Sequence, residues 1–245
     1  MEPKAVILIC ADAEWGVILE LVPNAYRQSS PYGEWFLACL SHRNTIDPVL
    51  PGAQMNQDAT SVIFLHTGWG KISAAGAAQY AIDRWRPSLM VNLGTCGGFE
   101  GEVQRGEILL VDRTVVYDIV EQMGDYDSHI DYYACELDYE WIREPYPQDV
   151  RRTLLVSGDR DLLVEDLPWL KERFGAVAGD WESGAIAYIA RQNSSRLLIL
   201  RGVTDLVGPG GGEAYGNPEL FHQATVGIMQ RLLQFLPPWI LQGIT

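Results

Sequence analysis

Basic residues are scarce in this chain of 245 residues: 18 lysines and arginines stand against 32 acids, which gives a formal net charge of −14. Proteins that bind nucleic acid usually carry a basic patch, and anionic membrane surfaces attract basic segments, so we expect neither as a partner. Long hydrophobic runs are also missing, since a bilayer span needs about 20 apolar residues. The apolar run Ala5–Cys10 is too short for a secretory signal, and acids follow it at once.

Cysteine and histidine occur only four times each. The cysteines form no C-x-x-C pair, which predicts reduced and mostly buried thiols; they are Cys10, Cys39, Cys96 and Cys135. The histidines have no metal-ligand spacing; they are His42, His66, His129 and His222. We therefore expect no metal site, and the cytoplasm is the expected compartment.

The remaining composition is that of an ordinary globular protein, with 47% hydrophobic and 20% charged residues. No repeat or linker divides the chain, so we expect one α/β domain over residues 1–245. Apolar strand-like runs alternate with helical patterns, which predicts a mixed, largely parallel sheet flanked by helices. The expected strands lie within 5–10, 31–40, 61–66, 89–99, 106–112 and 153–161, and residues 41–60 are expected to form a loop. The stretch 89–99 is expected to turn at its glycines, so that its strand stops before Phe99.

The stretch 178–207 organises the chain. A helix is predicted over residues 184–190, with Glu182 just inside its start, and a buried strand follows over 197–200. Asp205 is expected just past that strand, at the edge where open α/β sheets bind ligands, under a glycine-rich loop from Gly208. Helix capping is the alternative role for both acids.

Two more acids follow the first strand. Asp12 is a candidate N-cap for a helix that runs through Leu21, and Glu14 lies in its first turn. Either acid caps the helix or presents a carboxylate at the same sheet edge as Asp205.

The segment Gly68-Trp-Gly70 leads into a helix rich in small residues, whose first amides would favour an anion or a polar ligand. It only loosely matches a dinucleotide fingerprint, because Ser73 replaces the third glycine and no acid ends the next strand.

Two segments near the C-terminal half are less regular. Residues 121–148 are acidic and rich in tyrosine, which is typical of a binding loop or interface, or of a solvated loop. A closing helix is predicted over 217–236 and is expected to stop at Pro237-Pro238.

Several stretches together resemble the nucleoside phosphorylase and nucleosidase family, and most closely the methylthioadenosine/S-adenosylhomocysteine nucleosidases. They follow the family's order across nearly the whole chain. The matching pieces are TGWGKISAA from Thr67, NLGTCGGF from Asn92, RGEILLVD from Arg105, VSGD from Val156, WESGAIA from Trp181 and RGVTD from Arg201. The resemblance implies a nucleoside phosphorylase-like fold.

The resemblance also implies roles. Asp205 matches the acid that protonates N7 of a purine leaving group, and Glu182 matches the glutamate that binds the ribose hydroxyls. Glu14 is nearest to the water-activating glutamate, with Asp12 as its rival. Further matches position water or bind substrate: Thr67 and Arg201 for the water, Trp181 beside the sugar, Leu162 at the base, and Thr204 beside Asp205. Asp161, next to Leu162, is a candidate to receive an amino group of the base, with a surface charge as the alternative.

The residue types suit cleavage of an N-glycosidic bond. The leaving base needs a proton and water must be guided to C1′, which takes one carboxyl as acid and another as base. Asp205 must then hold a proton near neutral pH, whereas Glu182 is expected to be ionised. No metal or organic cofactor is needed.

The resemblance also bears on the nucleophile: the family's phosphorylases bind phosphate with an N-terminal glycine-aspartate turn followed by an arginine, whereas the matching stretch here, from Asp12 to Gly16, has no nearby arginine. Water is therefore the expected nucleophile, and a carboxylate at Glu14 would repel phosphate. A phosphorylase that uses the same Asp205 and Glu182 is one alternative, and a nucleoside-binding protein without turnover is another. Arg160 and Asp161 depart from the family pattern, so the base and the 5′ substituent stay open. The resemblance implies at least a homodimer.

Overall fold

The computed structural model describes residues 2–40, 45–53 and 59–244. Its twelve strands pair into one sheet: β1 (Ala5–Ile9), β2 (Gln28–Ser29), β3 (Glu34–Leu40), β4 (Ile46–Pro48), β5 (Thr60–His66), β6 (Leu89–Phe99), β7 (Ile108–Val116), β8 (Cys135–Glu136), β9 (Arg151–Ser157), β10 (Ala178–Asp180), β11 (Leu197–Gly208) and β12 (Gly211–Gly212). The helices are α1 (Asp12–Leu21), α2 (Lys71–Trp85), α3 (Tyr126–Tyr133), α4 (Leu167–Phe174), α5 (Ser183–Gln192), α6 (Pro218–Gly243) and the 3₁₀ turn η1 (Val164–Asp166).

Part of the sheet closes on itself. β6 pairs with β11 in parallel, β11 with β7 antiparallel, β7 with β9 in parallel, β9 with β10 in parallel and β10 with β6 antiparallel, which completes a ring of five strands. From β6 the sheet continues through β1, β5 and β3. The predicted α/β architecture is therefore confirmed, whereas the closed ring was not anticipated.

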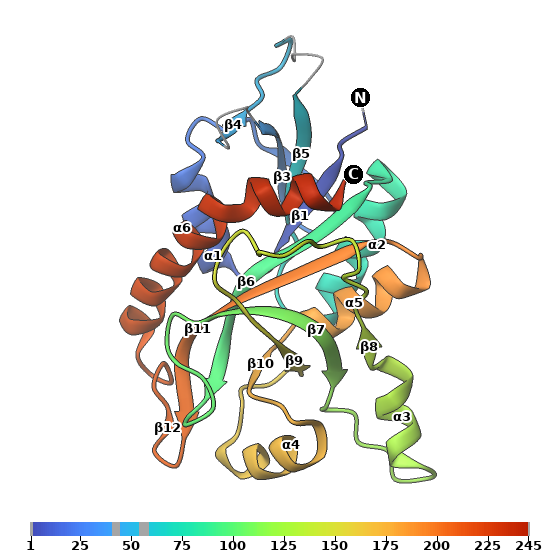
Figure 1. Ribbon diagram of the computed structural model, residues 1–245, viewed down its shortest axis with the longest axis vertical. Coiled ribbons are helices and arrows are strands. Elements are labelled where there is room, and N and C mark those ends of the chain that lie inside the picture. Colours follow the sequence, from blue (N-terminus) through green and yellow to red (C-terminus); the bar gives the residue numbers. More distant parts are fainter. Residues whose placement is uncertain (1, 41–44, 54–58, 245) are drawn as a thin grey trace.

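Helices cover both faces of the open part of the sheet (Figure 1). Every residue of β1 is buried, and alternate side chains enter opposite cores because successive residues of a strand point to opposite faces. Ile7 and Ile9 pack with α1 and α6, while Val6 and Leu8 pack with α2 and α5. A third core under α4 includes Leu162 and Val207. Within the described ranges no helix is both long and apolar enough to cross a bilayer.

Two strands run further than the sequence predicts. β6 continues through Gly94, Gly97 and Gly98 to Phe99, rather than turning at these glycines. A Cβ on Gly98 would lie 2.7 Å from Val203 Cγ1, so glycine there permits close strand packing. β11 extends to Gly208, so Asp205 lies inside the strand and not beyond its end.

Other predicted boundaries were also wrong. Residues 121–148, expected to be irregular, contain α3 and β8. Within the expected loop 41–60, residues 46–48 form the strand β4, which pairs with β3. Residues 41–44 and 54–58 of that loop lie outside the described residues. α6 continues through Pro237 and Pro238 to Gly243. Trp239 and Ile240 are fully buried in this last part, and their burial offsets the backbone hydrogen bonds that proline removes.

Gly202 lies where β11 meets α6, and it provides a test of this packing. A Cβ there would lie 2.2 Å from Ile228 Cγ2, so we expect Gly202→Ala to lower the free energy of unfolding by about 1–3 kcal/mol in urea titrations. Gly227→Ala on α6 is the control: nothing lies within 4 Å of its Cβ, and alanine favours helix, so stability should hold or rise. Equal urea midpoints for Gly202→Ala and wild type would contradict this packing.

Candidate active site

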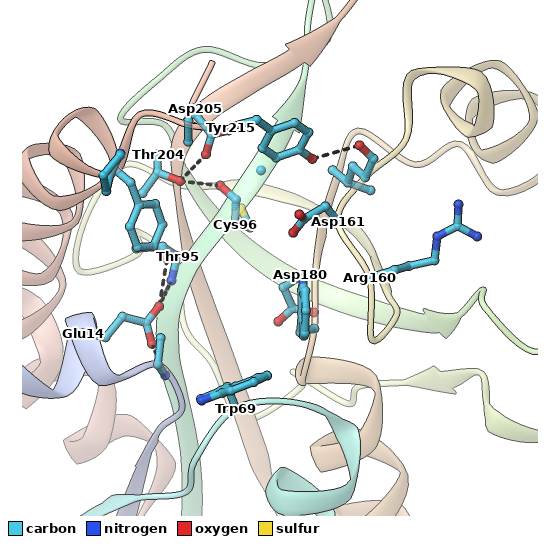
Figure 2. A pocket seen from close by; sticks show the side chains of 18 of the residues that line it. Glu14, Trp69, Thr95, Cys96, Arg160, Asp161, Asp180, Thr204, Asp205 and Tyr215 are labelled. Atoms are coloured by element: carbon cyan, nitrogen blue, oxygen red, sulfur yellow. Dashed lines mark hydrogen bonds between the residues drawn. The ribbon is translucent and has the colours of Figure 1, made fainter. Parts of the chain in front are cut away.

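A cavity of about 510 Å³ opens where β6, β9, β10 and β11 end. Side chains from distant segments reach it, as Figure 2 shows for Glu14, Asp161, Asp180 and Asp205. The lining consists of acids, small residues and aromatic rings: Ala11, Glu14, Trp69, Thr95, Cys96, Gly97, Arg160, Asp161, Leu162, Gly179, Asp180, Trp181, Glu182, Thr204, Asp205, Ala214, Tyr215, Gly216, Asn217, Pro218 and Phe221.

Glu14 rather than Asp12 belongs to this cavity. Glu14 is 3% exposed, and its Oε1 accepts hydrogen bonds from Thr95 N at 2.6 Å and from Thr95 Oγ1 at 2.8 Å. Its Oε2 accepts from Ala11 N at 3.2 Å, so Ala11 and not Asp12 occupies the N-cap of α1. The Asp12 side chain is 79% exposed and lies 3.2 Å from His66 Nε2.

Arg201 lies behind the cavity wall, 1% exposed. Its Nη2 lies 2.8 Å from Asp180 Oδ2, and Ser183 Oγ accepts from its Nε at 3.0 Å. A Cβ on Gly94 would lie 1.9 Å from Arg201 Nη1 and 2.7 Å from Glu14 Oε1, so glycine leaves room for the two groups to approach. Arg201 therefore does not line the cavity but supplies positive charge behind Glu14 and Asp180.

Asp205 enters the cavity from an irregularity in β11. The pairing with β6 shifts by one residue between Val203 and Asp205, as in a β-bulge, and such bulges re-aim side chains. Burial raises the pKa of Asp205, partly offset by hydrogen bonds from Thr204 and the Ala214 backbone. Burial thus shifts this carboxyl toward its neutral form.

The Thr204 hydroxyl lies between two oxygen acceptors. Thr204 Oγ1 lies 3.1 Å from Cys96 O and 2.7 Å from Asp205 Oδ1 (Figure 2). A hydroxyl carries one hydrogen and a backbone carbonyl can only accept. Thr204 therefore donates to one of the two oxygens or shares its hydrogen between them, and these contacts fix the position of the Asp205 carboxyl.

Glu182 is the N-cap residue of α5, and its Oε1 accepts a hydrogen bond from Gly70 N at 2.9 Å. Burial, followed by the charge of Asp180, raises the pKa of Glu182 to about 8. The carboxyl is thus mostly protonated at neutral pH, against the expectation of an ionised group. The first amides of α2 face carboxylates of the protein itself, since Asp159 Oδ1 accepts from Lys71 N at 2.7 Å.

Two tryptophans stand beside Glu182. Trp181 lines the cavity as expected, and its ring meets that of Trp69 edge to face at 6.0 Å between centroids. Trp69 is 63% exposed and was not singled out, although its place in a glycine turn at the expected ligand edge was a usable signal.

Asp161 and Arg160 point in different directions. Asp161 faces the cavity and has no ion-pair or hydrogen-bond partner among the described residues, whereas the Arg160 guanidinium turns away and lies 2.9 Å from Asp166 Oδ2 (Figure 2). Leu162 lines the cavity, and its carbonyl accepts from Tyr215 Oη at 2.8 Å. Tyr215 lies in the loop after β12, where the sequence offered no pattern to identify it.

Thr67 alone among the predicted substrate-binding residues lies away from the lining. It is fully buried, and its hydroxyl donates to Gly68 O at 2.8 Å. Thr95 and Asp180 were missed, although Thr95 lies within NLGTCGGF and Asp180 directly precedes WESGAIA. Among the described residues, no group of three or more histidine, cysteine or acidic side chains could hold a metal ion.

A family model for the phosphorylase superfamily matches residues 53–236. The chain is 26% identical over 160 residues to 5′-methylthioadenosine/S-adenosylhomocysteine nucleosidase of Oceanobacillus iheyensis, covering 60% of this chain and 69% of the relative. It is 29% identical over 140 residues to the protein of the same name in Thermotoga maritima, covering 57% and 63%.

Solved structures share the fold. A methylthioadenosine/S-adenosylhomocysteine nucleosidase of Colwellia psychrerythraea in complex with adenine superposes with a TM-score of 0.71 at 19% identity, covering 99% of this chain and 96% of that one. The Neisseria meningitidis nucleosidase with methylthio-immucillin-A also gives 0.71 at 19% identity, covering 96% and 99%.

The pKa of Glu182 predicts how stability changes with pH. Because the folded state holds this proton between the ordinary pKa of 4.5 and about 8, the free energy of unfolding should fall as pH rises through that range. Glu182→Gln should remove this part of the decline, which amounts to roughly 1.4 kcal/mol per unit of pKa difference. Urea titrations of both proteins at pH 5 and pH 8.5 measure it, and parallel pH profiles would show that Glu182 titrates normally.

Proposed function

The chain belongs to the phosphorylase superfamily, and we propose that it is a nucleosidase that hydrolyses the N-glycosidic bond of a purine nucleoside of the methylthioadenosine or S-adenosylhomocysteine type. The products are the free base and the sugar. The observation that carries the proposal is a pair of buried carboxyl groups, Glu14 and Asp205, on different walls of one cavity.

The two carboxyl groups have the surroundings that an acid and a base need. Burial shifts Asp205 toward its neutral form, and in this proposal Asp205 donates its proton to N7 of the leaving purine. Glu14 activates water for attack on C1′ from its place beside Thr95 and Arg201. The sugar gains positive charge as the bond breaks, and the surrounding acids stabilise that charge.

Glu182 receives the ribose hydroxyls. Hydroxyl donors and the Gly70 N–H stabilise its anion and oppose the effect of burial, so sugar binding is coupled to release of its proton. Trp181 packs beside the sugar, Thr204 holds Asp205, and Leu162 and Asp161 contact the base. Thr67 acts through the turn it stabilises.

Charge favours water over phosphate as the nucleophile. The lining contains the acids Glu14, Asp161, Asp180, Glu182 and Asp205. Arg160 is its only lysine or arginine and is paired with Asp166, while Arg201 is paired with Asp180 behind the wall. A dianionic phosphate would enter a cavity with no unpaired cation among these lining residues, and Glu14 would repel it.

A phosphorylase that uses the same acids remains the second candidate, favoured only by family membership; it would release base only when phosphate is added. A nucleoside-binding protein would bind without turnover.

We also propose that residues 1–245 act as one unit and that the enzyme is a cytoplasmic homo-oligomer, at least a dimer. This proposal rests on the resemblance and on solved neighbours that match over nearly their whole length.

Base release without phosphate tests the reaction. Wild type should release free base from methylthioadenosine or S-adenosylhomocysteine in phosphate-free buffer, as measured by chromatography. Glu14→Gln and Asp205→Asn should each lower kcat by about 10²- to 10⁴-fold, because each removes a proton-transfer group. Asp12→Asn, which changes the exposed neighbouring acid, should keep wild-type activity. Release that requires phosphate would make the protein a phosphorylase.

Asp161 predicts a preference at the base. In a purine, the C6 substituent lies on the same edge as N7. If Asp205 faces N7, the C6 substituent faces the neighbouring wall of the cavity, which presents two acceptors, Leu162 O and the Asp161 carboxylate. An amino group at C6 can donate to them, whereas a 6-oxo group cannot. Asp161→Asn should lower the kcat/KM of adenosine relative to that of inosine by roughly 10-fold.

Glu165→Gln removes one negative charge from the same segment outside the cavity lining and is the matched control. An unchanged adenosine-to-inosine ratio in Asp161→Asn would show that Asp161 does not contact the base.

A further inference from the structure

The turn between β5 and α2 is held by charged residues from two other parts of the sheet. Lys71 Nζ forms an ion pair with Asp118 Oδ1 and lies 3.8 Å from Asp159 Oδ2. Asp159 Oδ1 accepts from Lys71 N at 2.7 Å, and Asp159 N donates to Asp118 Oδ2 at 2.8 Å. Asp118 follows β7 and Asp159 follows β9, so these three residues, the Lys71 clamp, tie the start of α2 to the ends of two strands.

The clamped turn carries one of the hydrogen bonds of the cavity. Gly70 N donates to Glu182 Oε1 at 2.9 Å, immediately before Lys71 in the chain. Gly68 and Gly70 have φ values of +70° and +87°, a region that glycine enters at little cost and also leaves easily. The direction of the Gly70 N–H therefore depends on contacts outside the turn, and the clamp supplies them.

The cation at the centre of the clamp is partly buried. The side chains of Lys71 and Asp118 are 21% and 14% exposed, so water screens their charges less than at an open surface. Without the ammonium group the carboxylates of Asp118 and Asp159 would repel each other across the turn. The turn would then relax, and the Gly70 N–H would lose its alignment with Glu182.

We propose that Lys71, Asp118 and Asp159 are positioning residues for the sugar-binding end of the cavity: they hold the Gly70 N–H against Glu182 and so fix the carboxyl that receives the ribose hydroxyls. The proposal deepens the nucleosidase function and rests on it for the identity of the ligand. None of the three clamp residues lines the cavity or pairs with the proposed acid or base, so the clamp should affect substrate binding rather than the chemical step.

The other groups around Glu182 do not replace this contact. Asp180, Arg201, Glu14 and the thiol of Cys10 face it from β10, β11, α1 and the end of β1, and none of them holds the turn. The Gly70 hydrogen bond lowers the pKa of Glu182, whereas burial and the charge of Asp180 raise it. Loss of this hydrogen bond therefore leaves the two raising effects with less to counter them. The pKa of Glu182 should therefore rise further when the clamp is broken.

Lys71→Met breaks the clamp while keeping the length of the side chain. We expect the KM for methylthioadenosine to rise about 10-fold, the lower end for loss of a hydrogen bond to a charged group, with kcat within about 3-fold of wild type. Lys71→Arg restores the charge and should recover most of the loss. Lys171→Met removes a lysine paired with Glu102 at 2.5 Å outside the cavity lining, and it should leave KM unchanged.

A double-mutant cycle with Glu182→Gln separates positioning from general destabilisation. If the clamp acts through Glu182, Lys71→Met should change KM by less than about 2-fold in the Glu182→Gln background, because coupled groups are not additive. An unchanged KM in Lys71→Met alone, or the same fold-change in both backgrounds, overturns the proposal.

The clamp also has a readout that does not need catalysis. The difference in unfolding free energy with and without Glu182→Gln, followed against pH, reports the titration of Glu182, and its midpoint should move to higher pH in Lys71→Met. If wild type releases no base, the nucleosidase function is wrong and this midpoint alone decides the clamp. A midpoint that stays in place refutes it.

Discussion

The buried guanidinium of Arg201 is the charge on which the site depends. It lies 2.8 Å from Asp180, donates to Asn92 Oδ1 at 2.7 Å and to Ser183, and approaches Glu14 beside Gly94. Removing one partner of such a pair leaves an uncompensated buried charge, which typically costs about 3–5 kcal/mol. Arg201 thus lets several acids gather around one cavity. Asp205 does not pair with it, and burial shifts this acid toward its neutral form.

At the start of α2 the protein places its own acids, whereas a helix N-terminus after a glycine turn often binds the anion of a ligand. The first amides of a helix favour oxygen acceptors, and at α2 the amides of Gly70 and Lys71 already donate to carboxyl oxygens of Glu182 and Asp159. The anion-binding capacity of the glycine turn is therefore already used. An uncharged nucleoside, which presents hydroxyl and amino donors, matches such a surface better than a phosphorylated ligand does. The same logic explains why the cavity walls offer mostly acceptors.

Elements with strong periodicity were predictable from the sequence, and long-range geometry was not. β1, α1, β5 and α2 follow their apolar patterns closely. The bulge at Asp205 leaves no local signal, because it arises from the register with β6. The resemblance favoured Glu14 but left Asp12 as a rival, since only the packing of α1 decides which acid enters the cavity. Pro237 and Pro238 predict a helix end, but burial of Trp239 overrides the local preference. Tyr215 and Asp118 depend on contacts between segments far apart in the chain, which no pattern reveals.

The cavity residues fall into two groups, those on the ring of strands β6, β11, β7, β9 and β10 and those on the connections between elements. Thr95, Asp180 and Asp205 belong to strands of this ring, where no strand can slide without breaking hydrogen bonds on both sides. Trp69, Asp161 and Tyr215 belong to connections between elements, which tolerate replacement far more readily. Natural variation can thus change what enters the cavity while Thr95, Asp180 and Asp205 keep their places, so we expect relatives with the same ring to differ in ligand preference before they differ in the groups that the ring positions.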